Sequence, residues 1–174
     1  MIQQELETNR LVIRRINMSD CESIHRYMSR PDVVKFLPED LLSLDDVKKH
    51  QQANLKKPLA YAVDLKGHSK MIGHVVFHEI FNCYTYEIGW VFHPNFHGLG
   101  YASESALKVI EYGFTELKLH RIIATSQTEN TRSWKLMDRI GMRREGHFKE
   151  AVLKEGRWLD EYIYAILSQE FLPV

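Results

Sequence analysis

Hydrophobic and polar residues alternate along several short stretches of the chain, as they do in strands that bury one face. The stretch RLVIRRI alternates apolar and basic residues and predicts a strand at Leu11–Ile16. Similar stretches predict further strands at residues 58–65, 70–80, 84–92, 121–126, 142–148 and 161–167. The turns LKGHSK and FNC separate the first three of these, so those three strands are expected to form an antiparallel meander.

The stretches between these strands repeat their apolar residues with the period of a helix. They predict helices at residues 19–28, from Ser43 or Leu44 onward, at 101–116 and at 130–140. Ser19 stands where the N-cap of the first helix is expected. Pro31 and Pro38 discourage a continuous helix before the second one and predict a loop that wraps over another part of the molecule.

The predicted order is strand, two helices, three strands, helix, strand, helix and two strands. The helix between strands 84–92 and 121–126 is a crossover, which requires a parallel neighbour, whereas the meander is antiparallel. This order predicts an α+β fold with one mixed, mostly antiparallel sheet and helices on both of its faces. The 174 residues, 44% hydrophobic and 26% charged, suit one domain over residues 1–174.

The composition argues against several classes of protein. Lys plus Arg and Asp plus Glu both number 23, so the charge shows no preference for nucleic acid. No segment approaches the roughly 20 apolar residues that cross a bilayer, so no membrane partner is expected and the location is expected to be cytoplasmic. Cys21 and Cys83 are too few for a disulfide framework and lack the spacing of a zinc site.

The most informative stretch is WVFHPNFHGLGYASESALK, which starts in the strand 84–92 and ends in the helix 101–116. Gly98 and Gly100 lie beyond the carboxyl end of the strand, where open α/β sheets bind ligands and helix N–H groups attract phosphate. A phosphate-bearing ligand and a turn that only joins strand to helix explain these two glycines equally well. Ser103 replaces the third glycine of a dinucleotide-binding fingerprint, and the chain lacks the Lys-Ser or Lys-Thr of a P-loop here.

The segment HGLGYA, residues 97–102, resembles the Q/R-x-x-G-x-G/A pyrophosphate loop of the GNAT superfamily of acyl-CoA N-acyltransferases. The order of strands and helices is similar to that of the family as well. Four longer phrases resemble the branch of ribosomal-protein N-terminal acetyltransferases, the RimJ/RimL type: LETNRLVIRRI, YEIGWVFHP, HRIIATSQTENTRSWKLMDRIGMRREG and DEYIYAIL. His97 departs from the Gln or Arg that is usual in the family, but the loop binds mainly through backbone N–H groups, so binding is expected to survive.

The resemblance implies acetyl-CoA as the co-substrate and a parallel strand pair that splays apart where it binds. The loop residues implied to bind the pyrophosphate are His97, Gly98, Leu99, Gly100, Tyr101 and Ala102. Val91 and Phe92 are the expected contacts of the pantetheine arm, and a main-chain N–H near Val91 would stabilise the oxyanion. In the resembled branch an Asn contacts the cofactor and a Ser protonates the departing thiolate, which assigns these roles to Asn130 and Ser133. An N-cap and a residue of the first helical turn are their other interpretation.

Glu87 is the expected general base. Strand alternation places Glu87 on one face with Gly89 and Val91, and the family often has Glu at this position. A charge that anchors the sheet edge or pairs with a nearby histidine explains Glu87 equally well. Met137 stands where other branches have a tyrosine acid, so a tyrosine acid at that position is excluded.

Two side-chain patterns are explained by structure rather than chemistry. No carboxylate or cysteine has a matching spacing, so no metal site is expected at His74, His78, His93 and His97. Core packing against a helix explains most of an aromatic stripe on one strand face, formed by Tyr84, Tyr86, Trp90 and Phe92.

The sequence therefore predicts an N-acetyltransferase that transfers an acetyl group from acetyl-CoA to a primary amine, either a protein N-terminus or a small molecule. Direct attack in a ternary complex is expected, because neither cysteine has a partner that would suggest an acetyl-cysteine intermediate. A non-catalytic acyl-CoA-binding sensor with the same fold is the alternative. The acceptor pocket is expected to draw on loops at 31–43 and 154–161, because loops carry specificity on a rigid scaffold. An exposed strand edge would allow a homodimer.

Overall fold

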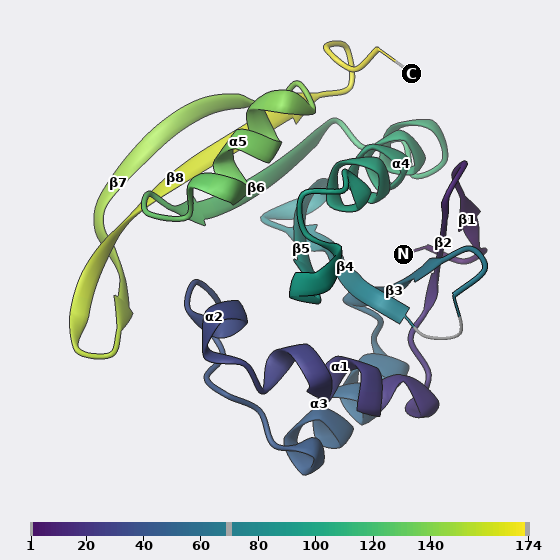
Figure 1. The fold of residues 1–174 in the computed structure, drawn as a ribbon. Coiled ribbons are helices and arrows are strands. Elements are labelled where there is room, and N and C mark those ends of the chain that lie inside the picture. The colour runs from purple at the N-terminus through teal and green to yellow at the C-terminus, as the bar shows by residue number, and fades with distance from the viewer. Residues whose placement is uncertain (1, 69–70, 173–174) are drawn as a thin grey trace.

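The strands form one twisted sheet, as Figure 1 shows for the computed structural model, which describes residues 2–68 and 71–172. Among these residues the sheet has eight strands in the order β1-β2-β3-β4-β5-β6-β8-β7. They are β1 (Leu6–Glu7), β2 (Leu11–Arg15), β3 (Ala60–Leu65), β4 (Met71–Ile80), β5 (Asn82–Phe92), β6 (Arg121–Gln127), β7 (Arg143–Lys154) and β8 (Arg157–Leu167). Neighbouring strands are antiparallel except β5 and β6, which are parallel, so the predicted mixed sheet is confirmed.

Helices cover both faces of this sheet (Figure 1). They are α1 (Cys21–Met28), α2 (Pro31–Val34), α3 (Leu44–Lys56), α4 (Tyr101–Thr115) and α5 (Thr131–Arg139), with the short 3-10 turns η1 (Met18–Asp20) and η2 (Pro94–Phe96). α4 and α5 bury the larger apolar core against one face, with Val109, Ile110 and Leu136 in its centre. α1 and α3 bury a second core on the other face, around Tyr27 and Val47. The sheet is therefore the middle layer of three.

The first helix begins differently from the prediction. Asn17, and not Ser19, is the cap, because its side chain accepts a hydrogen bond from the N–H of Ser19. The carboxylate of Asp20 in turn accepts the N–H of Asn17 at 2.9 Å, which completes a reciprocal capping box. This box closes the turn η1, and the α-helix proper starts only at Cys21.

Two short elements were not predicted. β1 has two residues and α2 has four, so neither is long enough to show a period in the sequence. Pro31 starts α2 instead of only interrupting a helix, because proline at the first helical position loses no hydrogen bond. The predicted strand at 70–80 is observed from Met71, and Lys70 lies outside the described residues.

The last two strands are longer than predicted, and the predicted loop at 154–161 is wrong. β7 continues to Lys154 and β8 starts at Arg157, so this segment is the tip of a hairpin that projects from the body (Figure 1). Glu155 and Gly156 form its two-residue turn with φ of 49° and 75°, the left-handed geometry that suits the twist of paired strands. The expected aromatic stripe is also incomplete, because Tyr84 is 62% exposed while Tyr86, Trp90 and Phe92 pack toward the larger core.

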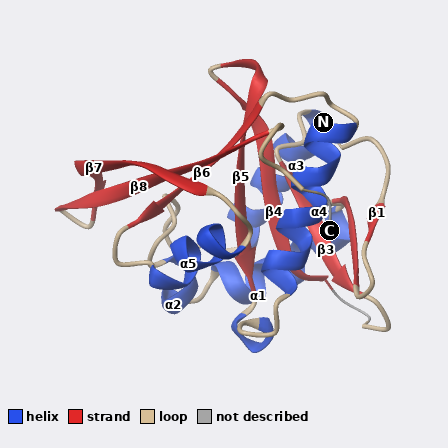
Figure 2. Cartoon of the chain, turned by 90° about the horizontal axis from the view of Figure 1, so that it is seen from above, coloured by secondary structure: helices blue, strands red, loops and turns tan. Residues whose placement is uncertain are grey.

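The feature of the fold that matters most for function is a break in the pairing of β5 and β6. Their ladder joins only Thr85–Glu87 to Arg121–Ile123, although β5 continues to Phe92 and β6 continues to Gln127. Beyond this ladder the two strands diverge, and Figure 2 shows β6, β7 and β8 leading away from β3, β4 and β5. The splayed parallel pair expected from the sequence is present.

Candidate functional site

A glycine loop connects the diverging end of β5 to α4. Gly98 and Gly100 have φ of 76° and 84°, a conformation that residues with a Cβ adopt only with strain. Gly100 is the N-cap of α4 and offers no capping side chain, so the first N–H groups of the helix have no side-chain acceptor. A Cβ built on Gly98 would meet nothing within 4 Å, which shows that the loop faces open space. This is the geometry of an anion-binding helix N-terminus.

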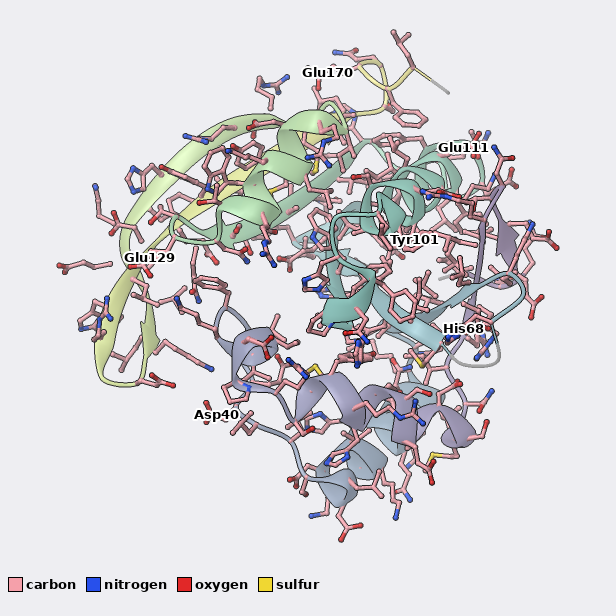
Figure 3. All side chains as sticks on the ribbon, viewed as in Figure 1. Asp40, His68, Tyr101, Glu111, Glu129 and Glu170 are labelled. Carbon is pink, nitrogen blue, oxygen red and sulfur yellow. The ribbon has the colours of Figure 1, made fainter. Side chains whose placement is uncertain are left out.

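Arg10 holds this loop from the side of β2. Its guanidinium donates to the Leu99 carbonyl at 3.0 Å, pairs with Glu104 at 2.6 Å and lies 4.5 Å from the centre of the Tyr101 ring. The Thr8 hydroxyl donates to the same Glu104 carboxylate at 2.5 Å. Figure 3 shows Tyr101 at the start of α4, where these contacts meet. Sequence reasoning did not identify Arg10 or Glu104, because the contact joins segments that are 94 residues apart.

The His97 side chain contacts both β5 and α5. Its Nε2 lies 2.8 Å from the Phe92 carbonyl, and its Nδ1 lies 3.3 Å from a guanidinium nitrogen of Arg132. Arginine only donates, so Nδ1 must accept and the proton of the neutral ring sits on Nε2. His97 therefore acts through its ring as well as through its backbone, which sequence reasoning did not anticipate.

The register of β4 and β5 decides which backbone groups of β5 face the divergence. The N–H of His93 donates to the Ile72 carbonyl, and His74 lies opposite Val91. Hydrogen-bonded pairs alternate in an antiparallel ladder, so the N–H and C=O of Val91 point toward β4. The free groups that face the divergence are those of Trp90 and the N–H of Phe92. Of the two contacts expected from the sequence, Phe92 has its N–H on this side and Val91 has neither backbone group there.

Glu87 occupies the last paired position of β5 before the strands separate. One of its carboxylate oxygens accepts from the Thr125 hydroxyl at 3.3 Å, and the other lies 3.8 Å from Nε2 of His78. Its side chain is 25% exposed, so solvent and ligands can reach it. A second carboxylate, that of Glu161 on β8, lies nearby, and burial and the charge of Glu87 raise its pKa. Sequence reasoning named Glu87 but not Thr125 or Glu161.

Asn130 and Ser133 lie where β6 leads into α5. The Asn130 side chain accepts from the N–H of Ser133 at 3.4 Å, so Asn130 is the N-cap of α5 and Ser133 belongs to its first turn. Both residues therefore have the structural role described above, an N-cap and a residue of the first helical turn. Only the N–H of Ser133 takes part in this cap, and its hydroxyl does not. Met137 is buried in the larger core, at 1% exposure. Contact of Asn130 and Ser133 with a cofactor stays a prediction.

A lysine joins the two segments expected to form the acceptor pocket. Nζ of Lys154, at the end of β7, donates to the carbonyls of Leu37 and Glu39 at 2.9 and 2.8 Å and lies 3.2 Å from the Asp40 carboxylate. Figure 3 shows Asp40 on the segment between α2 and α3, which wraps toward the hairpin as the sequence predicted. The lysine side chain is 11% exposed although it lies at a hairpin tip. The hairpin and the segment thus form one continuous wall.

The remaining candidates have other partners. His74 lies 2.7 Å from the Tyr27 hydroxyl beneath α1. Among residues 2–68 and 71–172, no three His, Cys, Asp or Glu side chains are grouped so that they could hold a metal ion. In the same part of the chain, no helix is long and apolar enough to cross a membrane.

The chain belongs to the GNAT family of acetyltransferases, because residues 10–143 match the family described as Acetyltransferase (GNAT) domain. It is an acetyl-CoA-dependent acetyltransferase. The uncharacterized N-acetyltransferase YnaD of Bacillus subtilis is 45% identical to it over 170 residues, which cover 95% of this chain and 98% of YnaD. The crystal structure of a GNAT-family acetyltransferase from Bacillus anthracis is 46% identical, with a TM-score of 0.93 over 96% of this chain and 100% of that one.

The expected branch is supported by a shorter similarity. The ribosomal protein uS5-alanine N-acetyltransferase of Escherichia coli is 30% identical over 91 residues, which cover 52% of this chain and 45% of that enzyme. This relative agrees with the RimJ/RimL type inferred from the sequence.

Proposed function

We propose that this chain transfers the acetyl group of acetyl-CoA to a primary amine, a protein N-terminus or a small molecule, by direct attack in a ternary complex. The observation that carries the proposal is the break between β5 and β6, with the glycine loop at its open end and Glu87 at its closed end. A phosphate-bearing cofactor with a long flexible arm fits between these two points.

The residues present fit acetyl-CoA, which supplies the acetyl group as an activated thioester. The N–H groups of residues 98–102 would hold the pyrophosphate, because the loop faces open space and begins a helix. The backbone of Trp90 and the N–H of Phe92 would pair with the pantetheine arm as a neighbouring strand would. The Phe92 carbonyl is already held by His97 and is not available to it. Asn130 would line the same space from α5.

The chemistry requires a proton acceptor and a proton donor, because the amine arrives as an ammonium ion and the sulfur leaves as a thiolate. Glu87 accepts the ammonium proton, and the freed amine forms the amide bond as the carbon–sulfur bond breaks. Ser133 gives the departing sulfur its proton and regains one through solvent from the attacking nitrogen, which loses its second proton as the amide forms. The net products are the N-acetylated amine, CoA and one proton, and a main-chain N–H of β5 stabilises the charge on the carbonyl oxygen.

A non-catalytic sensor of acyl-CoA is the second candidate. The glycine loop and Arg10 would serve a sensor equally well, but a sensor has no use for a carboxylate at the closed end of the break. The partly exposed Glu87 therefore favours the enzyme.

The test is the release of free CoA from acetyl-CoA, followed with a thiol-reactive dye against a panel of amines. Calorimetric titration with CoA measures the binding site separately. Amine-dependent release of CoA supports the enzyme, and tight binding of CoA with no release for any amine supports the sensor. Failure to bind CoA contradicts both.

We also propose a cytoplasmic location and a homodimer. The outer edge of β7, which no strand of the described residues covers, offers a surface for a second copy.

A further inference from the structure

His78 of β4 lies directly opposite Glu87 of β5. The two residues form one pair of the antiparallel ladder, and their side chains are 28% and 25% exposed. Gly89 follows Glu87 on the same face of β5, and a Cβ built there would meet only the Cβ of Val76 within 4 Å, at 3.7 Å. Because Gly89 has no side chain, the face beside this pair is open toward the diverging end of β5.

The hydrogen bonds of the two side chains leave one free acceptor atom on each. Nδ1 of His78 lies 3.1 Å from the Glu79 carbonyl, and a carbonyl only accepts, so Nδ1 carries the proton of the neutral ring and Nε2 carries none. Oε1 of Glu87 accepts the Thr125 hydroxyl, and Oε2 faces Nε2 of His78. In the part of the chain that the structure describes, neither Nε2 nor Oε2 receives a hydrogen bond.

Two free acceptors that face each other suit a ligand with several donors. The distance between Nε2 and Oε2 is 3.8 Å, which is longer than a hydrogen bond. An ammonium group has three N–H donors, and hydrogen bonds of about 2.9 Å allow two of them to reach both atoms at once. Among the described residues, no lysine or arginine forms an ion pair with Glu87, so an ammonium ligand would also supply the missing countercharge.

We propose that His78 binds the acceptor amine together with Glu87. Nε2 of the neutral ring accepts one N–H of the ammonium group, while Oε2 of Glu87 accepts a second N–H and then takes that proton. The ring itself gains no proton and holds the nitrogen that attacks the thioester. This inference rests on the proposed function and adds a residue to it. Pairing with a histidine and acting as the base, which the sequence left as two alternatives for Glu87, become parts of one role.

The test replaces His78 by a residue without the acceptor atom and by one that retains it. Leu has no polar atom, whereas Gln can place its amide oxygen near the position of Nε2. In His78→Leu, KM for the fastest amine of the panel should rise about 10-fold or more while kcat changes less, because the lost hydrogen bond is to a charged group. KM of His78→Gln should stay within about threefold of the wild type. Both variants should keep the wild-type Kd for CoA.

The matched control is His120→Leu, at an exposed histidine just before β6, which should keep the wild-type KM. A second measurement needs no turnover. The nitrogen NMR signals of the histidine rings are followed in the CoA-saturated protein during titration with butylamine and with alaninamide, which imitate a small amine and a protein N-terminus. The bound ammonium should shift the Nε2 signal of His78, which is assigned by its absence in His78→Gln.

Two results overturn the inference: equal KM values of the wild type and His78→Leu, or an Nε2 signal of His78 that neither amine shifts. The proposed function is judged by other measurements, the binding of CoA and its release from acetyl-CoA. If CoA binds and no amine is acetylated, the NMR titration still decides whether His78 binds an ammonium group.

Discussion

Gly100 has a φ of 84°, and the nearest atom that a Cβ would meet is a flexible guanidinium nitrogen of Arg10 at 3.3 Å. Backbone conformation, more than space, therefore requires glycine at this position. Gly100→Val should strain the loop by about 1–3 kcal/mol and place a side chain over the N–H groups of α4. We expect CoA affinity to fall by about 10-fold or more, measured by calorimetric titration.

Gly67 provides the control, because it has a similar φ of 78° in the turn before β4 and also has open space around it. Gly67→Val should lower the melting temperature to a similar extent without changing the Kd for CoA. Equal CoA affinity of the wild type and Gly100→Val would remove the phosphate-loop assignment.

His97 makes a donor contact and an acceptor contact at once, so its best replacement is a side chain that does both. Gln can donate its amide N–H to the Phe92 carbonyl and accept from Arg132, as the neutral ring does. His97→Gln should therefore bind CoA within about threefold of the wild type, and His97→Leu, which makes neither contact, should bind it more weakly by about 10-fold, as expected for a net loss of about 1 kcal/mol or more. Equal affinity of both variants would reduce His97 to a backbone role.

Glu87 is tested by the pH dependence of the rate. Loss of a base matters most when the amine is mainly protonated, so Glu87→Gln should lower kcat/KM strongly near neutral pH and less as the pH approaches the pKa of the amine. Gln preserves the size of the side chain and can still contact Thr125. Glu79→Gln, an exposed neighbour on β4, is the control and should follow the wild-type profile. A constant ratio of wild-type to Glu87→Gln rates across pH would make Glu87 a structural residue, and water would then take the proton.

At the scale of elements, the hairpin and the segment after α2 depend on one lysine. Lys154→Met keeps the length of the side chain but removes three donor contacts to residues 37–40. The hairpin should separate from that segment, the free energy of unfolding should fall by about 1–2 kcal/mol, and proteolysis between α2 and α3 should accelerate. Denaturant unfolding and limited proteolysis measure these effects, and KM for the amine should rise while the Kd for CoA stays the same.

Lys49→Met is the control for this substitution, because the Lys49 side chain is 75% exposed on α3 and lies 3.9 Å from its nearest partner. Identical proteolysis of Lys154→Met and Lys49→Met would show that the wall does not depend on Lys154.

The elements that the sequence predicted correctly are those long enough to repeat their apolar residues several times. The strands of the meander alternate apolar and polar residues, and the helices α4 and α5 repeat their apolar residues over whole turns. Both the type and the order of these elements were therefore predicted correctly. The hairpin tip was missed because Lys154 to Glu161 is rich in polar residues, and polar residues on an unburied strand look like a loop. Thr125 and Glu161 were missed for another reason. The pairing of β5 with β6 brings Thr125 to Glu87, and the pairing of β6 with β8 brings Glu161 near them; register is a tertiary property that no local pattern contains.

At the scale of the whole molecule, function depends on a sheet that is continuous at one end and divided at the other. The larger core under α4 and α5 spans both halves and holds them together. The second core, under α1 and α3, covers β3 and β4 and contains Val91 at the open end of β5. Glu87 lies beyond this second core, and its side chain remains 25% exposed. A protein can keep a rigid fold and still leave strand backbone available to a cofactor in this way.

The second core also predicts how the stability of the whole molecule depends on pH. Burial lowers the pKa of His74 from its ordinary value of 6.5 to about 4, because the ring lies beneath α1 and packs against Tyr27. Below pH 6.5 the unfolded chain therefore binds a proton that the folded chain does not, and stability falls as the pH falls from 6.5 to 4. Most carboxylates titrate at the lower end of this window, so the upper part reports mainly on histidines. His74→Gln can still hydrogen-bond the Tyr27 hydroxyl but cannot titrate, so its free energy of unfolding should fall less steeply over the same range. Urea unfolding of both proteins at several pH values measures the difference, and parallel curves for the two proteins would show that His74 is not the group responsible.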